Sequence, residues 1–147
     1  DYAYYMKGMN YFHQISDVTR DQSITYVALK SFNEVINRFS NSEYANDSKE
    51  KIKIINDRLA GKELNIALQY QNDHQWIAAI NRYDDIINKF GQTRYVPEAL
   101  HRLVEIYLTI GINQQAEKYA ATLGHNYPDS YWYKASYELI NKELKSN

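Results

Sequence analysis

The chain has 147 residues, which is enough for one domain with a buried core or for one stretch of a repeat array. Its 5 Gly and 2 Pro are too few to form the turns of a β-sandwich or barrel, so a helical fold is expected. A net charge of -1 disfavours a nucleic-acid partner, and the absence of Cys excludes disulfides, thiolate zinc sites and cysteine nucleophiles.

The first predicted element is a helix that begins near the N-terminal end of the sequence. Its apolar surface is wider than one partner helix needs. That surface is formed by Tyr2, Tyr4, Tyr5, Met6 and Met9. We therefore expect further repeats to precede this helix in a longer protein. A polar stretch follows at residues 16–23, and it is interpreted as a surface loop between two helices.

A stripe of apolar residues that is typical of a packed helix occurs three times. Each copy has a small residue followed by apolar residues at helical spacing, so that they share one face. The copies are Ala28-x3-Phe32-x2-Val35-Ile36-x2-Phe39, Ala79-x3-Tyr83-x2-Ile86-Ile87-x2-Phe90 and Ala116-x3-Ala120-x2-Leu123-x3-Tyr127. Such self-similarity is the signature of a repeat protein.

The first two copies are 51 positions apart, from Ala28 to Ala79, whereas a tetratricopeptide repeat has a period of about 34 residues. The excess lies within residues 45–62. Apolar residues recur there at steps of three and four, namely Ile52, Ile55 and Leu59. One long helix is therefore predicted, with Ser40-x2-Glu43 as a capping box before it.

The rest of the chain carries further signals for the ends of helices. Residues 74–76 are expected to form the tight turn of the second hairpin. Pro97 suits the first turn of the next helix, and Asp129 or Ser130 is expected to cap the last one. That last helix becomes charged towards its end, as the closing face of an array should. The charged residues are Lys142, Glu143 and Lys145.

Two of the helices before these stripes share a second pattern. The matching segments are Glu63-x2-Ile66-Ala67-x2-Tyr70 and Leu100-x2-Leu103-Val104-x2-Tyr107. Together with the stripes they match the tetratricopeptide pattern. We therefore predict an all-α fold, a tetratricopeptide-like helical repeat array (α-solenoid) of about three helix-turn-helix repeats with one long helix. Residues 1–147 would form a single domain, the C-terminal part of a longer array, with approximate repeats 1–42, 43–92 and 93–147.

Residue patterns that carry catalytic chemistry are weak in this sequence. Glu98-x2-His101 is half of a di-metal carboxylate signature, and the sequence has no second copy. Asp84 and Asp85 are adjacent, so in a helix they point about 100° apart and are expected to be solvated. The sequence also lacks a phosphate-binding loop and a nucleophile elbow. We therefore predict no catalytic, cofactor or metal site and no enzymatic activity.

The sequence contains 15 Tyr, and their placement bears on whether a binding groove exists. Those at repeat positions are expected to pack in the core with the hydroxyl group at its rim. Groove-facing positions are instead expected at Leu64 and Leu68, and then at His101 and Glu105. This set is not a cationic clamp for a C-terminal carboxylate.

An ordered set of segments resembles one known family. The segments are Asp1-Tyr2-Ala3-Tyr4-Tyr5-Met6-Lys7-Gly8-Met9, Arg20-Asp21, Phe39-x-Asn41-Ser42-x-Tyr44-Ala45, Asp57-Arg58-Leu59-Ala60-x2-Glu63, Tyr70, Trp76-x-Ala78-x2-Asn81-Arg82 and Gln115-Ala116-Glu117-Lys118. Over essentially the whole chain they resemble the BamD (ComL) family of outer-membrane assembly lipoproteins. The resemblance implies the last three of that family's five repeats.

This resemblance implies a non-enzymatic scaffold of the BAM complex, at the periplasmic face of the outer membrane in Gram-negative bacteria. The family's lipid anchor is attached to a Cys that is not in this chain. Its C-terminal repeats dock on a periplasmic POTRA domain of the barrel-forming partner. Its N-terminal repeats are associated with unfolded outer-membrane proteins. Other assembly lipoproteins are further implied partners, and no cofactor is implied.

By position, the resemblance nominates Arg82, with the adjacent Asn81, as a POTRA contact. Arg82 lies off the tightest packing stripe, so its guanidinium group is expected to reach solvent. Arg58 is a weaker nominee, because an ion pair within the array is the more plausible role for it. An alternative function remains open, that of a generic tetratricopeptide-repeat co-chaperone or adaptor that binds peptides.

Overall fold

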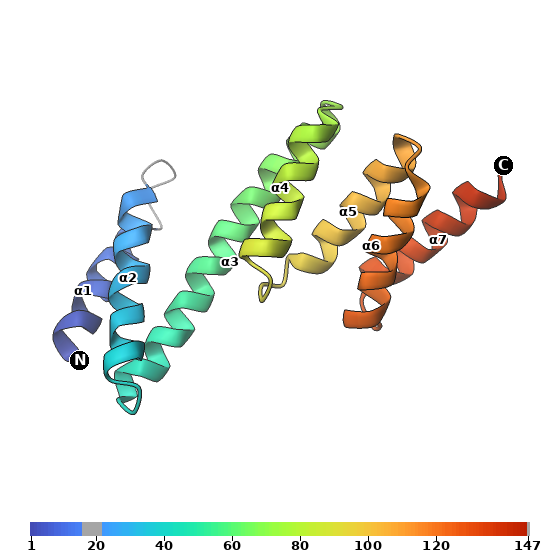
Figure 1. Cartoon of the computed structure of the whole chain (residues 1–147). Coiled ribbons are helices and arrows are strands. Elements are labelled where there is room, and N and C mark those ends of the chain that lie inside the picture. The colour runs from blue at the N-terminus through green and yellow to red at the C-terminus, as the bar shows by residue number, and fades with distance from the viewer. Residues whose placement is uncertain (16–21, 147) are drawn as a thin grey trace. The chain divides into compact units, whose positions relative to one another are not determined.

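The computed structural model describes residues 1–15 and 22–146, and the regular structure in this part of the chain is entirely helical. The helices are α1 (Tyr2–Ile15), α2 (Gln22–Arg38), α3 (Glu43–Asn72), α4 (Trp76–Lys89), α5 (Val96–Thr109), α6 (Asn113–Asn126) and α7 (Tyr131–Lys145). Consecutive helices pair as hairpins (Figure 1). The predicted all-α, tetratricopeptide-like fold is confirmed.

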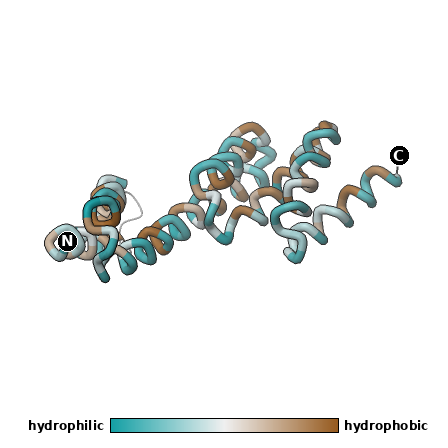
Figure 2. Tube along the Cα trace, turned by 60° about the horizontal axis from the view of Figure 1, so that its bottom comes forward, coloured by the Kyte–Doolittle hydropathy of each residue, from teal (hydrophilic) through white to brown (hydrophobic). Residues whose placement is uncertain are grey.

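The chain forms two compact units, Asp1–Arg58 and Leu59–Asn147, so that the boundary falls inside α3. We refer to them as the first unit and the second unit. Hydrophobic and hydrophilic stretches alternate along the helices of both, as amphipathic helices require (Figure 2). Among the described residues, no helix combines the length and apolar character that a membrane span needs.

The first unit is built on the hairpin of α1 and α2. The predicted stripe of α2 forms its core, because Ala28, Phe32 and Val35 are fully buried. Gly8 lets the two helices approach closely. A Cβ atom at Gly8 would lie 2.7 Å from the ring of Phe32, a distance that real Cβ atoms do not reach.

The predicted surface loop falls largely outside the description of the structure. Residues 16–21 lie outside the described residues. Gln22 and Ser23, which the sequence assigned to the loop, belong to the first turn of α2. The helix therefore begins earlier than its polar first residues suggested.

The long helix is confirmed, because α3 runs without a break for 30 residues. Its N-terminal cap was assigned to the wrong serine. Ser42, not Ser40, accepts a hydrogen bond from the backbone N–H of Tyr44 at 3.1 Å. A turn closed by the bond from the N–H of Ser42 to the carbonyl of Phe39 places Ser42 at the start of the helix.

The second unit contains the C-terminal end of α3 and the helices α4 to α7. The repeat positions Ala79, Tyr83, Ile86, Ala116 and Leu123 are all fully buried, which confirms the register of the second and third stripes. The small alanine side chains allow neighbouring helices to pack at close distance.

The turns of this unit follow the signals in the sequence. The predicted tight turn at residues 74–76 is confirmed: His74 has a φ of 59° and its ring stacks on that of Trp76 at 5.1 Å. Gly111, between α5 and α6, has a φ of 83°, which favours glycine. Pro97 lies in the first turn of α5, as expected.

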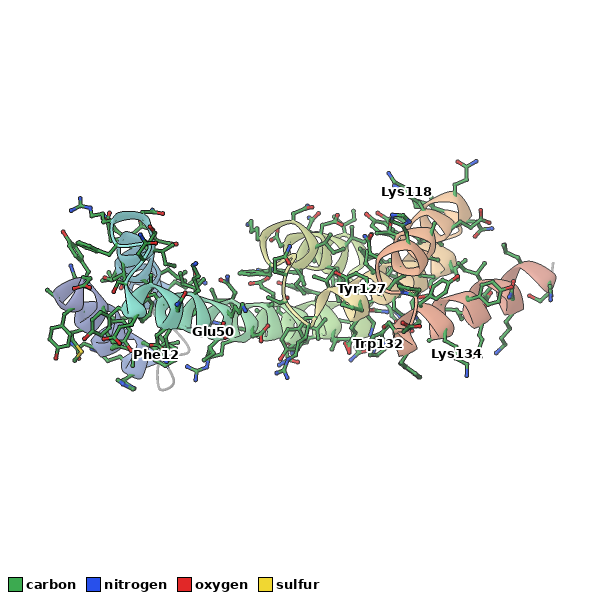
Figure 3. All side chains as sticks on the ribbon, turned by 90° about the horizontal axis from the view of Figure 1, so that it is seen from below. Phe12, Glu50, Lys118, Tyr127, Trp132 and Lys134 are labelled. Atoms are coloured by element: carbon green, nitrogen blue, oxygen red, sulfur yellow. The ribbon has the colours of Figure 1, made fainter. Side chains whose placement is uncertain are left out.

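The last helix is capped by Ser130, one of the two residues that the sequence offered. Its side chain accepts a hydrogen bond from the backbone N–H of Trp132 at 3.1 Å. Trp132 itself lies near the start of α7 (Figure 3). The charged residues at the end of α7 are exposed, as predicted.

Replacing Ser130 with alanine is expected to lower the free energy of unfolding by about 1 kcal/mol, because the N–H of Trp132 loses its partner. Denaturant unfolding would measure this. Asp129→Ala is the matched control, since Asp129 is exposed and the cap is Ser130. Equal losses in the two variants would contradict the assignment of the cap.

Candidate partner-binding surface and a buried polar network

Arg82, the residue nominated for partner binding, lies on α4 in the second unit. Its Nη1 atom donates hydrogen bonds to both carboxylate oxygens of Glu63 on α3, at 3.1 and 3.0 Å. The side chain of Arg82 is 39 % exposed and that of Glu63 is 19 % exposed. The hydrogen bond with Glu63 is the main cause that raises the pKa of Arg82 above its usual value. The neighbouring Asn81 is exposed.

The structure therefore adds a partner that the sequence did not indicate. Arg82 reaches solvent in part, as expected, but it also forms an ion pair within the chain. No sequence signal could have found this pair, because Glu63 and Arg82 are 19 positions apart on two different helices. Their contact depends on how α3 and α4 pack.

Arg58, the second nominee, belongs to the first unit and is exposed. Its guanidinium group lies over the ring of Phe12, 5.2 Å from the ring centroid. Lys51 approaches the same ring at 5.7 Å. In the part of the chain that the structure describes, the contact of Arg58 is this cation–π contact, and the expected ion pair within the array stays a prediction. Asn81 and Arg82 belong to the second unit.

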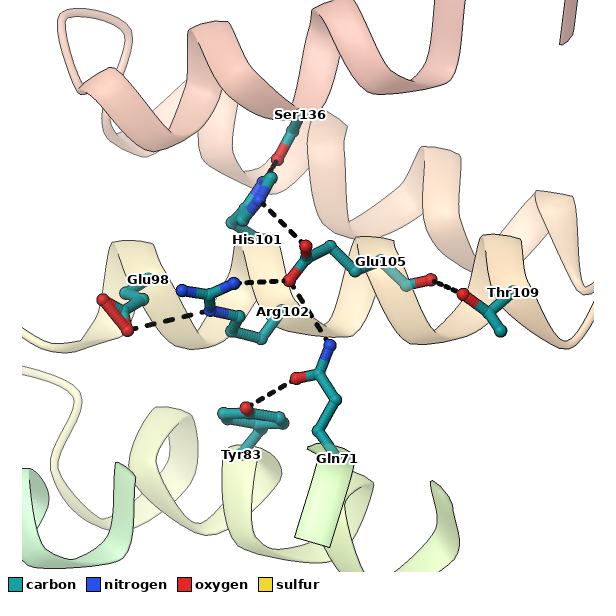
Figure 4. A network of polar contacts seen from close by, with 8 residues as sticks. All are labelled: Gln71, Tyr83, Glu98, His101, Arg102, Glu105, Thr109 and Ser136. Carbon is teal, nitrogen blue, oxygen red and sulfur yellow. Dashed lines mark hydrogen bonds and ion pairs between the residues drawn. The ribbon is translucent and has the colours of Figure 1, made fainter. Parts of the chain in front are cut away.

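A network of buried and half-buried polar side chains lies in the second unit (Figure 4). His101 on α5 is buried, and its Nδ1 atom is hydrogen-bonded to the hydroxyl of Ser136 on α7 at 2.7 Å. Its Nε2 atom lies 3.8 Å from a carboxylate oxygen of Glu105. His101 thus links α5 to α7 inside the core.

Glu105 is the centre of this network. Its carboxylate accepts hydrogen bonds from Arg102 at 2.9 Å and from the amide of Gln71 at 3.4 Å. Gln71 in turn accepts a hydrogen bond from the hydroxyl of Tyr83 at 2.7 Å. Arg102 also lies over the ring of Trp132, at 5.2 Å. The network therefore joins side chains from α3, α4, α5 and α7.

This network corrects the interpretation of the opening helices. Leu64 and His101 were expected to face a groove, but both are buried, with 6 % of their surface exposed. Leu68 and Glu105 are half-buried, Leu68 against the same core. Glu98 pairs with Arg102, at 3.8 Å, while His101 faces Ser136 and Glu105. Both residues of the half-signature for metal binding thus form polar contacts within the fold. Within the described residues, no group of three or more His, Asp or Glu is placed to hold a metal ion.

Asp84 was also expected to be solvated, and that expectation was wrong. It is half-buried and accepts a hydrogen bond from the hydroxyl of Tyr119 at 3.2 Å. Burial raises the pKa of Asp84 above its usual value. Burial, followed by the charge of Asp84, raises the pKa of Tyr119 to about 12. Asp85 does face outward enough to pair with Lys89, at 3.6 Å.

Burial lowers the pKa of His101, although the charge of Glu105 acts in the opposite direction. The unfolded chain takes up a proton at this position near pH 6.5. The folded protein does so only at lower pH, so below about pH 6.5 the unfolded state binds more protons. The contribution of His101 to stability is therefore complete above that pH and is lost as the pH falls.

We expect the free energy of unfolding to fall more steeply between pH 7 and pH 5 in the parent chain than in a His101→Gln variant. Glutamine keeps one hydrogen-bonding group for Ser136 but does not titrate. Urea unfolding at several pH values would measure the difference. Parallel pH profiles would contradict this role of His101.

Helix hairpins whose cores combine small and large apolar residues define a tetratricopeptide-like helical repeat protein. Residues 1–123 match the YfiO family, described as an outer membrane lipoprotein. The chain belongs to this family.

Relatives agree with this assignment. The chain is 47 % identical over 140 residues to a protein of Caulobacter vibrioides. This match covers 95 % of the chain and 46 % of that protein. The chain is 46 % identical over 139 residues to a protein of Rickettsia prowazekii, covering 95 % and 55 %. A Neisseria meningitidis protein is 33 % identical over 140 residues, covering 88 % and 52 %. All three are named outer membrane protein assembly factor BamD. The chain therefore spans about half the length of the curated relatives that it matches.

Proposed function

We propose that this chain is a scaffold segment of the machinery that assembles β-barrel proteins in the outer membrane. The observation that carries the proposal is the match of 95 % of the chain to two relatives named assembly factor BamD. The described core is packed with apolar and hydrogen-bonded polar side chains, as a rigid scaffold requires. In this proposal the role is non-enzymatic.

The proposed docking partner is a periplasmic POTRA domain of the barrel-forming assembly protein, with Arg82 as the principal contact. Two features support Arg82: its partly exposed guanidinium group, and the fact that only Nη1 bonds to Glu63. The exposed Asn81 beside it offers an amide that both donates and accepts hydrogen bonds. Arg58 is a weaker candidate, because one face of its guanidinium group is covered by Phe12.

The same proposal places the chain at the periplasmic face of the outer membrane. Other assembly lipoproteins are proposed as neighbours there. Unfolded outer-membrane proteins are proposed as substrates, mainly through the N-terminal repeats that the family resemblance implies. The family description as an outer membrane lipoprotein supports this location.

The test is a binding measurement between the 147-residue chain and purified POTRA domains, by calorimetry in a low-salt and a physiological buffer. We expect saturable binding that weakens with salt, because an arginine contact is screened. Absence of binding in both buffers would contradict the docking role. Binding to unrelated peptides with equal affinity would favour a generic adaptor instead.

A further inference from the structure

The guanidinium group of Arg82 already binds the carboxylate of Glu63, and this limits how a carboxylate of a partner can bind it. Within the second unit its Nη1 atom is held by Glu63 at 3.0 and 3.1 Å. Among the described residues, Nε and Nη2 have no hydrogen-bond partner. A guanidinium group has five N–H donors, so a second carboxylate can bind at the free edge while Glu63 stays in place.

A partner carboxylate at that edge would meet two opposing charges. It would be attracted by Arg82 and repelled by Glu63, whose carboxylate lies on the far side of the same guanidinium group. Coulomb energy falls only as the inverse of distance, so the repulsion is smaller than the attraction but of the same order. Both side chains are partly buried, where screening by water and salt is weaker than in bulk solvent.

Other charges near Arg82 do not remove this repulsion. Asp85, three residues further along α4, is paired with Lys89 at 3.6 Å and is thereby compensated. Among the described residues, Glu63 is paired with Arg82. When Arg82 engages a partner, Glu63 must either share the cation or lose it.

We propose that Glu63 is an internal competitor for Arg82 and keeps the affinity of this surface for an acidic partner below the highest value that Arg82 could support. The inference rests on the proposed docking through Arg82. It assigns to Glu63 a role in setting affinity and selectivity. A partner binds here only if its carboxylate reaches the free edge of the guanidinium group. Surfaces with little negative charge are therefore excluded.

The experiment compares the affinity of the parent chain and of Glu63→Gln for purified POTRA domains. Glutamine keeps the shape of the side chain and one oxygen for Arg82 but removes the negative charge. We expect about tenfold tighter binding, which corresponds to about 1.4 kcal/mol. Glu138→Gln, on the exposed surface of α7 in the same unit, makes the same change in net charge and should leave the affinity unchanged.

A double-mutant cycle with Arg82→Ala separates the two ideas. The gain from Glu63→Gln should become clearly smaller when Arg82 is absent, because only direct repulsion between Glu63 and the partner then remains. If Arg82→Ala weakens binding but Glu63→Gln does not strengthen it, docking through Arg82 stands and the competitor role is wrong. If Arg82→Ala binds like the parent, the docking contact itself fails, and this inference fails with it.

Melting temperatures show whether the variants remain folded. Should Glu63→Gln prove unstable, Glu63→Ala provides a second measurement, because it removes both the charge and the hydrogen-bonding oxygen. A folded Glu63→Ala variant that binds more tightly than the parent supports competition. One that binds more weakly shows that Glu63 positions Arg82 and overturns the inference.

Discussion

Replacing Ala79 with leucine is expected to destabilise the second unit by about 1–3 kcal/mol. Ala79 is fully buried on α4, within the same core cluster as Leu100 and Leu103 of α5. A leucine there adds three carbon atoms where the packing leaves no space for them. Neighbouring side chains must leave their preferred rotamers, or the helices must move apart.

Chemical denaturation of the parent and the variant measures this effect. Ala121→Leu is a matched control, because Ala121 is exposed on α6 of the same unit and the substitution is chemically identical. The control should unfold at nearly the same denaturant concentration as the parent. Equal stability of all three proteins would show that the close approach of the helices at Ala79 is not required.

Replacing Arg82 with glutamate is expected to weaken binding to POTRA domains by about 2 kcal/mol or more if the contact is desolvated. The substitution replaces attraction with repulsion towards a carboxylate of the partner. It also places two carboxylates together, because Arg82 is paired with Glu63. A small loss of stability, of about 1 kcal/mol or less, is therefore expected as well, since both side chains are partly exposed.

Two controls separate binding from folding. The double variant Glu63→Lys with Arg82→Glu restores an ion pair of reversed polarity within the chain, so its melting temperature should return towards that of the parent. Its affinity should stay low, because the partner still meets a glutamate at position 82. Lys118→Glu makes the same change in net charge on the exposed surface of α6 and should bind normally. If Arg82→Glu and Lys118→Glu bind equally well, Arg82 is not a contact.

The sequence nominated the proposed contact residues but did not show what their side chains touch. The resemblance in the sequence nominated Arg82, Asn81 and Arg58 by alignment alone. The structure adds what each nominee touches: Glu63 for Arg82 and the ring of Phe12 for Arg58. Because these contacts are known, substitutions at Glu63 and Arg82 have different expected effects on binding and on stability.

The sequence by itself determined the helical fold, the order of its repeated helices and some of the helix ends. The stripes that start at Ala28, Ala79 and Ala116 predicted buried helical faces, and these residues are indeed fully buried. The long helix also followed from the sequence, and so did a cap at Asp129 or Ser130, of which the structure selects Ser130. These features depend on residues within a few positions of one another, where helical periodicity and capping act, so a local pattern is sufficient.

Only the tertiary structure decided which polar side chains meet. Arg82 pairs with a residue 19 positions away, and His101 with one 35 positions away. Asp84, which looked solvated, is half-buried because Tyr119 of α6 packs against it. Such contacts depend on the angle and spacing at which separate helices pack, and no periodic pattern in the sequence encodes them. For this reason the sequence predicted the helical fold correctly, whereas the partners of the charged side chains could be identified only from the tertiary structure.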